Sequence, residues 1–236
     1  MRNYFVFDGV DSRTLGVYIS GSGTYNSPAR AYDLQEIPGR DGALVGYERR
    51  LGNVELTYPA FICRDFAEKV RSLRALLLSR TGYVRLEDSY HPEEYRMALY
   101  QGGLEVTPTP VNDAGSFDLT FHCKPQRYLK SGEERRTYTE NGVIVNPAMF
   151  DAQPLIRIYG AGRLGIGDCS VIVREEKDAY TDVDCALMEA FFQTASRNSN
   201  VVLSGNEFPT LRPGNNGVQL GAGIRKVEIV PRWWTV

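Results

Sequence analysis

The sequence is poor in the residues from which metal sites and nucleophilic active sites are built. There are only two histidines, His91 and His122, and four cysteines that stand singly along the chain: Cys63, Cys123, Cys169 and Cys185. Without a CxxC pair or zinc-ligand spacing, the cysteines are interpreted as free thiols. No nucleophile-elbow pattern accompanies the serines. We therefore expect no metal, no other cofactor and no enzymatic activity.

An excess of basic charge is also missing, as is any long apolar run. The chain has 27 Lys+Arg against 29 Asp+Glu, a formal net charge of -2. Proteins that bind nucleic acid along a surface carry a basic excess, so no sequence-specific nucleic-acid partner is expected. The N-terminus contains no unbroken apolar stretch of signal-peptide or membrane-span length. We expect no membrane insertion and a product that initially stays in the cytoplasm where it is made.

What the sequence does contain favours strands. Among 236 residues there are 14 Tyr and 10 Phe, which pack well on pleated surfaces. Apolar and polar side chains alternate over 53–63 and again over 117–123, the period-2 pattern of a strand with one buried face. Two more strands are predicted over 83–87 and 94–100. Between them, the polar stretch that includes His91 predicts a turn.

One helix is predicted, directly after the strand over 53–63. Its buried face is indicated by apolar residues at spacings of four, three and four: Phe66, Val70, Leu73 and Leu77. Asp65 stands three residues before Glu68, which predicts a capping box at the helix start. The helix is expected to end before Gly82.

A domain boundary is predicted near the polar stretch KSGEERR at 130–136, since no apolar period crosses it. The domains are therefore 1–129 and 130–236. The second half contains many short strand-like runs with turn pairs such as Asn141-Gly142 and Asn216-Gly217, which predict a sandwich or jelly roll. Residues 185–194 are predicted, weakly, as a short helix.

Two motifs in the second half could carry chemistry. Residues 160–165 match the dinucleotide fingerprint GxGxxG, but strand-like sequence follows where a helix is required, so a glycine-rich hairpin is predicted. Acidic residues cluster at 175–184: Glu175, Glu176, Asp178, Asp182 and Asp184. Their spacing does not fit an EF-hand. We interpret them as a solvated strand and turn face, with a bound cation or a catalytic carboxylate pair as the alternatives.

The segment Pro38-Gly39-Arg40-Asp41-Gly42 is the strongest turn signal in the first half. Proline presets φ at one position and glycine permits positive φ at another. The simplest interpretation is a tight loop. The functional alternative is a projecting hairpin that presents Arg40 and Asp41 to a neighbouring subunit.

The order of several motifs over nearly the whole chain resembles the distal tail protein family of siphophages. In the first half these are FDGVDSRTLGVYISGSGTYNSPAR, EIPGRDG, YPAFI, YRMALY and FHCKPQRYL; in the second half they are NPAMFDAQPLIRIYG, EFPTLRPGNNGVQL and KVEIVPRWW. The resemblance implies a mainly β fold. Its N-terminal part would be a β-sandwich-like, tail-tube-related domain with one α-helix and a projecting hairpin, followed by a C-terminal galectin-like β-sandwich (jelly roll).

The resemblance also implies a role at the virion tail tip, after assembly in the cytoplasm of a bacterial host. The protein would be a structural hub: a homo-hexameric ring that joins the tail-tube protein to the tail-associated tip or fibre protein and lets DNA pass through its lumen. Where a baseplate exists, the ring would also hold receptor-binding or baseplate proteins. The chain is too short for an added adhesion insertion.

A closed ring needs two different patches on each subunit, and the candidate inter-subunit contacts are Phe5, Phe7, Gly9, Pro38, Gly39, Arg40, Asp41 and Gly42. The alternative function is a carbohydrate-binding module for host-surface attachment. The only tryptophans, Trp233 and Trp234, are expected to take opposite faces, so that at most one lies in a core.

Overall fold

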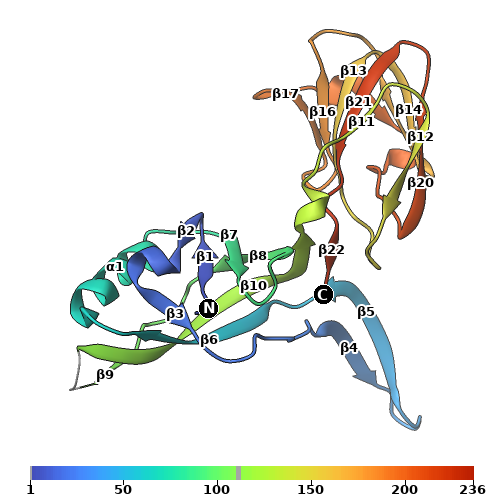
Figure 1. The fold of residues 1–236 in the computed structure, drawn as a ribbon. Helices are drawn as coiled ribbons and strands as arrows, with labels where there is room; N and C mark the ends of the chain where they lie inside the picture. The colour runs from blue at the N-terminus through green and yellow to red at the C-terminus, as the bar shows by residue number, and fades with distance from the viewer. Residues whose placement is uncertain (1, 110–112) are drawn as a thin grey trace. The chain divides into compact units, whose positions relative to one another are not determined.

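The computed structural model describes residues 2–109 and 113–236. The chain divides into two compact units, Met1–Arg127 together with Val236, and Tyr128–Thr235 (Figure 1). Both units consist mainly of strands, and α1 (Phe66–Leu78) is the only α-helix in the described residues. The predicted mainly β fold with one helix is confirmed. The roles assigned from the sequence to residues 1–129 and 130–236 stay predictions.

An antiparallel sheet forms the body of the first unit, with strands in the order β2-β1-β7-β8-β10-β6-β3 and β9 also paired with β10. The strands are β1 (Phe5–Phe7), β2 (Val10–Asp11), β3 (Val17–Ile19), β6 (Val54–Ile62), β7 (Val84–Asp88), β8 (Glu94–Leu99), β9 (Val106–Thr109) and β10 (Ala114–Leu129). A short 3-10 helix, η1 (Ser12–Leu15), connects β2 to β3. The strands predicted over 53–63, 83–87, 94–100 and 117–123 are all present.

The alternation in β6 and β10 builds the core of this unit. In the register of the two strands, Tyr58 lies opposite Leu119 and Leu56 opposite Phe121, and all four side chains are buried. The ring of Phe121 lies 5.2 Å from that of Phe7, measured between centroids. Because the side-chain period of a strand is two, the same alternation leaves the other face of both strands to solvent.

Helix α1 has the predicted buried face but a different cap. Phe66, Val70, Leu73 and Leu77 are buried against the strands. Asp65 takes a left-handed conformation and makes no side-chain cap, so the predicted capping box is wrong. Its carboxylate pairs instead with Lys69 at 3.1 Å. The Phe66 N–H donates to the Asp113 carboxylate at 3.2 Å, a partner 47 residues away that no local pattern could predict.

The second unit is a sandwich of two antiparallel sheets, as predicted. One sheet has the order β11-β21-β13-β16-β17-β18 and the other β12-β20-β14-β15-β19. The strands are β11 (Arg136–Tyr138), β12 (Gly142–Asn146), β13 (Leu155–Gly160), β14 (Gly162–Ile166), β15 (Cys169–Val173), β16 (Thr181–Asp184), β17 (Glu189–Phe192), β18 (Ala195–Ser196), β19 (Val201–Leu203), β20 (Gly214–Leu220) and β21 (Ile224–Val230). The short strand β22 (Trp234–Thr235) belongs to neither of these two sheets and pairs with β10. Side chains of both sheets, such as Ile158 and Ile166, share one core. Short 3-10 helices are η2 (Lys130–Gly132), η3 (Asn198–Asn200) and η4 (Ser204–Asn206).

Two local predictions in this unit are wrong. The segment 185–194 is not a helix: it contains the turn of the β16–β17 hairpin, in which Val183 lies opposite Ala190, then β17 and the start of the next turn. Met188 and Gln193 have positive φ in the two turns. The pair Asn216-Gly217 lies inside β20 and not in a turn. Buried Asn216 instead fixes the chain before the strand, since its amide group donates to the carbonyl oxygens of Arg212 and Gly214.

The glycine-rich stretch 160–165 joins the two sheets. β13 belongs to one sheet and β14 to the other. The predicted glycine-rich hairpin is formed by β14 and β15, which pair antiparallel with Ile166 opposite Cys169. The exclusion of a dinucleotide site agrees with this geometry, because a strand and not a helix follows Gly160. At this corner the backbone passes so close to residues 222–223 that side chains cannot fit at Gly160 or Gly162.

Candidate subunit-contact surface

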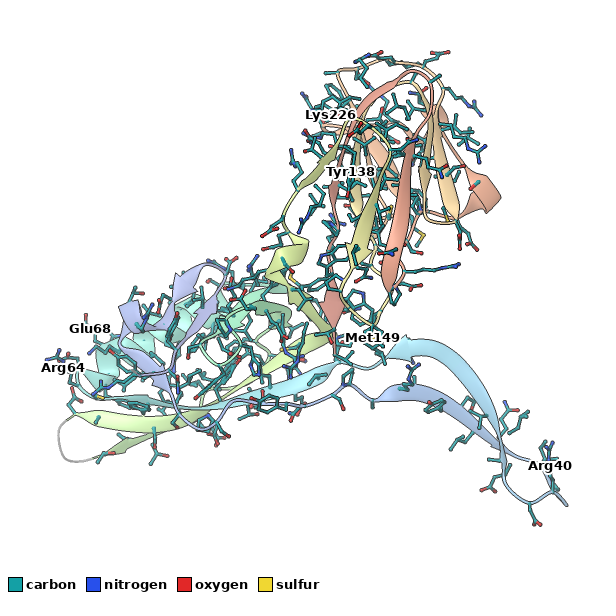
Figure 2. The ribbon with its side chains drawn as sticks, turned by 45° about the vertical axis from the view of Figure 1, so that its right-hand side comes forward. Arg40, Arg64, Glu68, Tyr138, Met149 and Lys226 are labelled. Carbon is teal, nitrogen blue, oxygen red and sulfur yellow. The ribbon has the colours of Figure 1, made fainter. Side chains whose placement is uncertain are left out.

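The hairpin of β4 (Arg30–Glu36) and β5 (Ala43–Leu51) is a separate two-stranded sheet in the first unit (Figure 1). Its strands are antiparallel, with Leu34 opposite Val45 and Glu36 opposite Ala43. Arg40 lies at its far end (Figure 2). The projecting hairpin expected from the sequence is therefore present.

The tip of the hairpin is a tight turn built by the expected residues. The Arg40 N–H donates to the Ile37 carbonyl at 3.1 Å, and Gly39 has φ of +81°. Proline at the second position and a glycine with positive φ at the third define a type II turn. Nothing lies within 4 Å of a Cβ built on Gly39 or Gly42. These glycines are therefore required by backbone conformation and not by close packing.

The two faces of the hairpin differ in polarity. Residues directly opposite each other in an antiparallel pair share a face, so Tyr32, Leu34 and Val45 lie on one side. Their exposed fractions are 54%, 63% and 57%. On the other side, the Gln35 amide donates to the Asp33 carboxylate at 3.0 Å, and Leu44, which lies opposite Gln35 and is 50% exposed, is a single large apolar side chain. We call Tyr32, Leu34 and Val45 the apolar face of the hairpin.

An exposed apolar ribbon of this kind is an unusual feature for a folded chain. Two-stranded hairpins are marginally stable alone in water, and contiguous exposed apolar residues mark interaction sites. Both edges of the hairpin also present backbone groups that can pair with another chain. The apolar face is therefore the surface of the first unit best suited to contact another protein.

The structure separates the sequence-predicted contact residues into two groups. Pro38, Gly39, Arg40, Asp41 and Gly42 are all exposed at the hairpin tip, and Gly9 is exposed in the turn between β1 and β2. These six stay candidate contacts.

The side chains of Phe5 and Phe7 do not belong among the candidate contacts. Both side chains are 0% exposed in the core of the first unit, because β1 is an inner strand between β2 and β7. They cannot reach a neighbouring subunit. Sequence reasoning missed the apolar face, although Tyr32 and Leu34, two positions apart in a strand-like stretch, were a usable signal.

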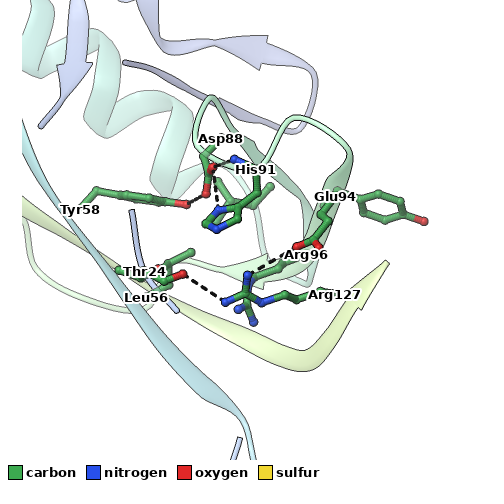
Figure 3. A pocket seen from close by; sticks show the side chains of 10 residues that line it. Thr24, Leu56, Tyr58, Asp88, His91, Glu94, Arg96 and Arg127 are labelled. Carbon is green, nitrogen blue, oxygen red and sulfur yellow. Dashed lines mark hydrogen bonds and ion pairs between the residues drawn. The ribbon is translucent and has the colours of Figure 1, made fainter. Parts of the chain in front are cut away.

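The segment 20–29, which leads from β3 into the hairpin, is held over a polar cluster (Figure 3). Arg127 Nη2 donates to the Thr24 carbonyl at 3.1 Å, and the rings of Tyr25 and His91 meet edge to face at 5.2 Å. Asn26 donates to the Glu55 carbonyl at 3.1 Å. The base of the hairpin is thus tied to the body of the unit by specific polar contacts.

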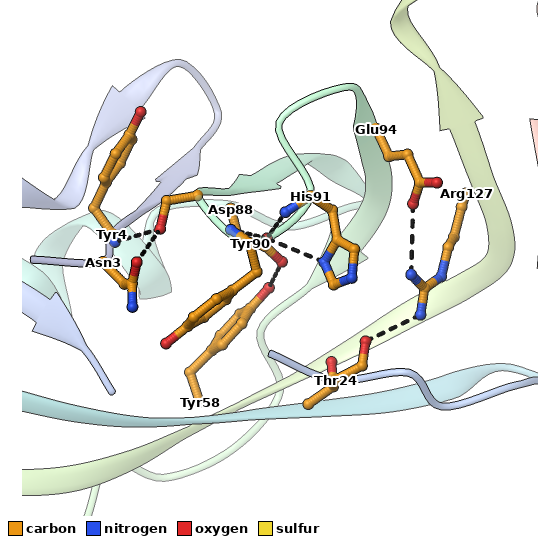
Figure 4. Close-up of polar contacts among 10 residues, drawn as sticks. Asn3, Tyr4, Thr24, Tyr58, Asp88, Tyr90, His91, Glu94 and Arg127 are labelled. Carbon is orange, nitrogen blue, oxygen red and sulfur yellow. Dashed lines mark hydrogen bonds and ion pairs between the residues drawn. The ribbon is translucent and has the colours of Figure 1, made fainter. Parts of the chain in front are cut away.

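Asp88 organises the neighbouring turn, as Figure 4 shows. Its Oδ2 accepts the Tyr58 hydroxyl at 2.6 Å. Its Oδ1 accepts the backbone N–H groups of Tyr90 at 2.9 Å and His91 at 2.8 Å, and lies 3.3 Å from His91 Nδ1. Burial, followed by the nearby Asp88 charge, raises the pKa of Tyr58 well above its ordinary value. The Tyr58 hydroxyl therefore stays protonated and donates its hydrogen bond to Asp88.

The solvated-face interpretation of the acidic cluster holds for Glu175 and Glu176, which are exposed, but it is wrong for Asp182 and Asp184. Asp182 and Asp184 are each 4% exposed. Arg157 pairs with Asp182 at 2.8 Å and Arg232 with Asp184 at 2.8 Å. The others also face cations: Glu176 pairs with Arg225, Asp178 with Arg197 and Glu175 with Lys177. Within residues 2–109 and 113–236, no group of three or more ligating side chains could hold a metal ion.

The two tryptophans pack within the protein, and none of the four cysteines forms a disulfide. Trp233 is 2% exposed in the core, whereas Trp234 is half-buried, stacks on Phe150 at 4.4 Å between centroids and donates to the Asp151 carbonyl at 2.8 Å. The prediction of opposite environments is confirmed. All four cysteines are free, and burial raises the pKa of the Cys123 thiol to about 11 and that of Cys185 to about 12.

Comparison with known proteins identifies the fold. No family model matches the sequence, and no curated protein matches it. Among solved structures, the chain is similar over 100% of both chains to the Dit protein of phage SPP1, with a TM-score of 0.77 and 16% identity. That protein is described as a paradigm of the hub adsorption apparatus in phages that infect Gram-positive bacteria. A chain of the phage P2 baseplate in its activated conformation with Ca matches over 97% of both chains, with a TM-score of 0.53 and 12% identity.

Both matched chains come from a phage tail hub or baseplate, and this chain shares their β-rich fold. The chain has the fold of the Dit protein along its entire length. The resemblance to distal tail proteins seen in the sequence is confirmed for the fold. No helix in the part of the chain that the structure describes is long and apolar enough to cross a membrane.

Proposed function

We propose that the protein is a structural hub of a phage tail tip. In this proposal it forms a homo-hexameric ring that joins the tail-tube protein on one side to the tail-associated tip or fibre protein on the other, with DNA passing through the lumen. It would act without catalysis, in the virion tail, after assembly in the host cytoplasm. The full-length match in fold to the SPP1 Dit protein is the observation that carries the proposal.

The hairpin supplies the contact that ring closure requires. A cyclic ring is closed by a heterologous interface, in which one patch of each subunit meets a different patch of the next. The apolar face of the hairpin is one such patch, since Leu34 and Val45 are more than half exposed. The tip residues Pro38–Gly42 would lie at the end of the same contact. We propose that each hairpin packs on the neighbouring copy.

Replacing Leu34 by Asp should weaken this ring without unfolding the chain. Leu34 is 63% exposed, so the monomer loses little packing, whereas a charge buried in a subunit contact is costly. We expect the concentration needed for ring formation to rise at least about tenfold, which corresponds to about 1.4 kcal/mol. Light scattering and negative-stain microscopy of purified protein over a concentration series measure it.

Gln35→Asp is the matched control, because it adds the same charge one residue away on the polar face. Sixfold rings in wild type and Gln35→Asp, lost in Leu34→Asp, are the expected pattern. Rings that persist unchanged in Leu34→Asp would refute the hairpin contact. A wild-type chain that stays monomeric, and also forms no ring with its neighbouring tail proteins, would refute the hub itself.

A further inference from the structure

A small cavity in the first unit is lined by two buried arginines from adjacent strands (Figure 3). Arg96 on β8 and Arg127 on β10 are each 7% exposed. Both occupy inward positions of their strands, Arg96 in phase with Ala98 and Arg127 in phase with Cys123. Arginine is rarely buried unless its charge is offset, so the pair requires a physical explanation.

The guanidinium nitrogens of this pair are incompletely satisfied. Nη1 and Nη2 of Arg96 and Nε of Arg127 are buried and have no hydrogen-bond partner among the described residues. Nε2 of His91, which also lines the cavity, is in the same state. A buried polar group without a partner costs free energy comparable to a lost hydrogen bond, and more when the group is charged.

The carboxylates that line the cavity offset Arg96 only in part: burial and Arg127 outweigh the Glu94 charge, which by itself raises the Arg96 pKa. Both oxygens of Asp88 already accept hydrogen bonds, from the Tyr58 hydroxyl and from backbone N–H groups. Glu94 lies 3.4 Å from Arg127 Nη1, a long contact, and its side chain is 25% exposed. Burial and the neighbouring Arg127 lower the pKa of Arg96. The two cations therefore repel each other in a poorly compensated site.

We propose that this cavity binds a small inorganic anion of halide size, held between the guanidinium groups of Arg96 and Arg127. An anion accepts the free N–H donors and offsets the like charges at once, whereas a neutral water offsets no charge. The cavity volume of about 20 Å³ exceeds the roughly 10–15 Å³ that one water needs. This space suits a single monatomic ion better than the larger sulfate or phosphate.

The bound anion would also fix the base of the hairpin. Arg127, which would hold the anion, donates to the Thr24 carbonyl, and Thr24 lies in the segment 20–29 that leads into β4. Gly23 packs close to Tyr90 and His91, where a Cβ would lie 3.0 Å from the Tyr90 side chain. Holding Arg127 in place therefore holds this segment, independently of what the hairpin contacts.

The test is calorimetric unfolding of the full chain during a titration of chloride or bromide against gluconate at constant ionic strength. Calorimetry is needed because both tryptophans lie in the second unit. A ligand that binds only the folded state raises the melting temperature saturably. We expect a saturable stabilisation by both halides, whereas sulfate should give only the gradual, non-saturable stabilisation that it gives folded proteins in general. Hydrogen exchange of residues 20–29 should slow over the same halide range.

Two variants and one direct measurement decide the result. Arg96→Met should weaken the apparent halide affinity at least tenfold, whereas Arg71→Met, which removes an exposed arginine of α1, should respond as wild type does. Bromide should give an anomalous scattering peak between Arg96 and Arg127 in crystals of the wild-type protein, which needs no variant to fold. No halide dependence in wild type, an equal dependence in Arg96→Met, or a peak elsewhere only would overturn the site.

Discussion

Gly160→Ala is expected to unfold the second unit or to lower its free energy of unfolding by about 4 kcal/mol or more, among the largest effects of a single substitution. Gly160 has φ of +108°, and an added Cβ would lie 2.1 Å from the Gly223 carbonyl oxygen. The opposing segment cannot withdraw easily, because a Cβ on Gly223 would itself lie 2.1 Å from the Ala161 carbonyl oxygen. At this corner between the two sheets, an added Cβ would therefore clash with backbone atoms and not with a flexible side chain.

Urea unfolding followed by tryptophan fluorescence measures this effect, since Trp233 lies in the core of the same unit. Two glycines of this unit separate the clash from the dihedral strain. Gly205 has φ of +70° but nothing within 4 Å of its Cβ position, so Gly205→Ala should cost only about 1–3 kcal/mol. Gly217 has neither a positive φ nor a neighbour within 4 Å, so Gly217→Ala should change little. Equal losses in all three variants would contradict the close-approach argument.

Asp184→Ala should destabilise the second unit by about 3 kcal/mol, the usual cost of removing one partner of a buried ion pair. Arg232 donates to Asp184 Oδ1 at 2.8 Å and to Oδ2 at 2.9 Å. Oδ1 also accepts the backbone N–H groups of Ala186 at 3.0 Å and Leu187 at 3.1 Å. The substitution therefore removes the buried carboxylate that Arg232 and two backbone N–H groups share as an acceptor.

The same carboxylate makes stability depend on pH. Burial alone would raise the pKa of Asp184, but the Arg232 contact and the two backbone N–H groups outweigh it, and the pKa is lowered. A lowered folded-state pKa contributes stability that is present above the unfolded pKa of about 3.9 and is lost as pH falls below it. Urea unfolding between pH 7 and pH 3 should show a smaller acid-induced loss in Asp184→Ala than in wild type.

Glu176→Ala is the control for Asp184→Ala. It removes the partner of Arg225 in an ion pair whose side chains are 41% and 61% exposed, and exposed pairs contribute little. We expect nearly unchanged stability at pH 7. A loss as large as that of Asp184→Ala would mean that burial is not what makes the Asp184 pair important.

Much of the fold follows from local periodicity. The alternation in 53–63 and 117–123 specifies a half-buried strand, because every second side chain shares a face. The spacing of Phe66, Val70, Leu73 and Leu77 specifies a helix with one buried side. Pro38 and Gly39 specify their turn through backbone dihedrals alone. In each case the determining interactions lie within a few residues along the chain.

The sequence by itself therefore determined the strands, the helix, the hairpin turn and the order of motifs that resembles distal tail proteins. Only the tertiary structure decided that Phe5 and Phe7 are core residues, since this depends on β1 lying between β2 and β7. Only it showed Asp184 paired with Arg232, 48 residues away, and Arg96 beside Arg127 on a neighbouring strand. Periodicity assigns a residue to a face, but which charges meet is fixed by strand order and register, through contacts that are distant in sequence.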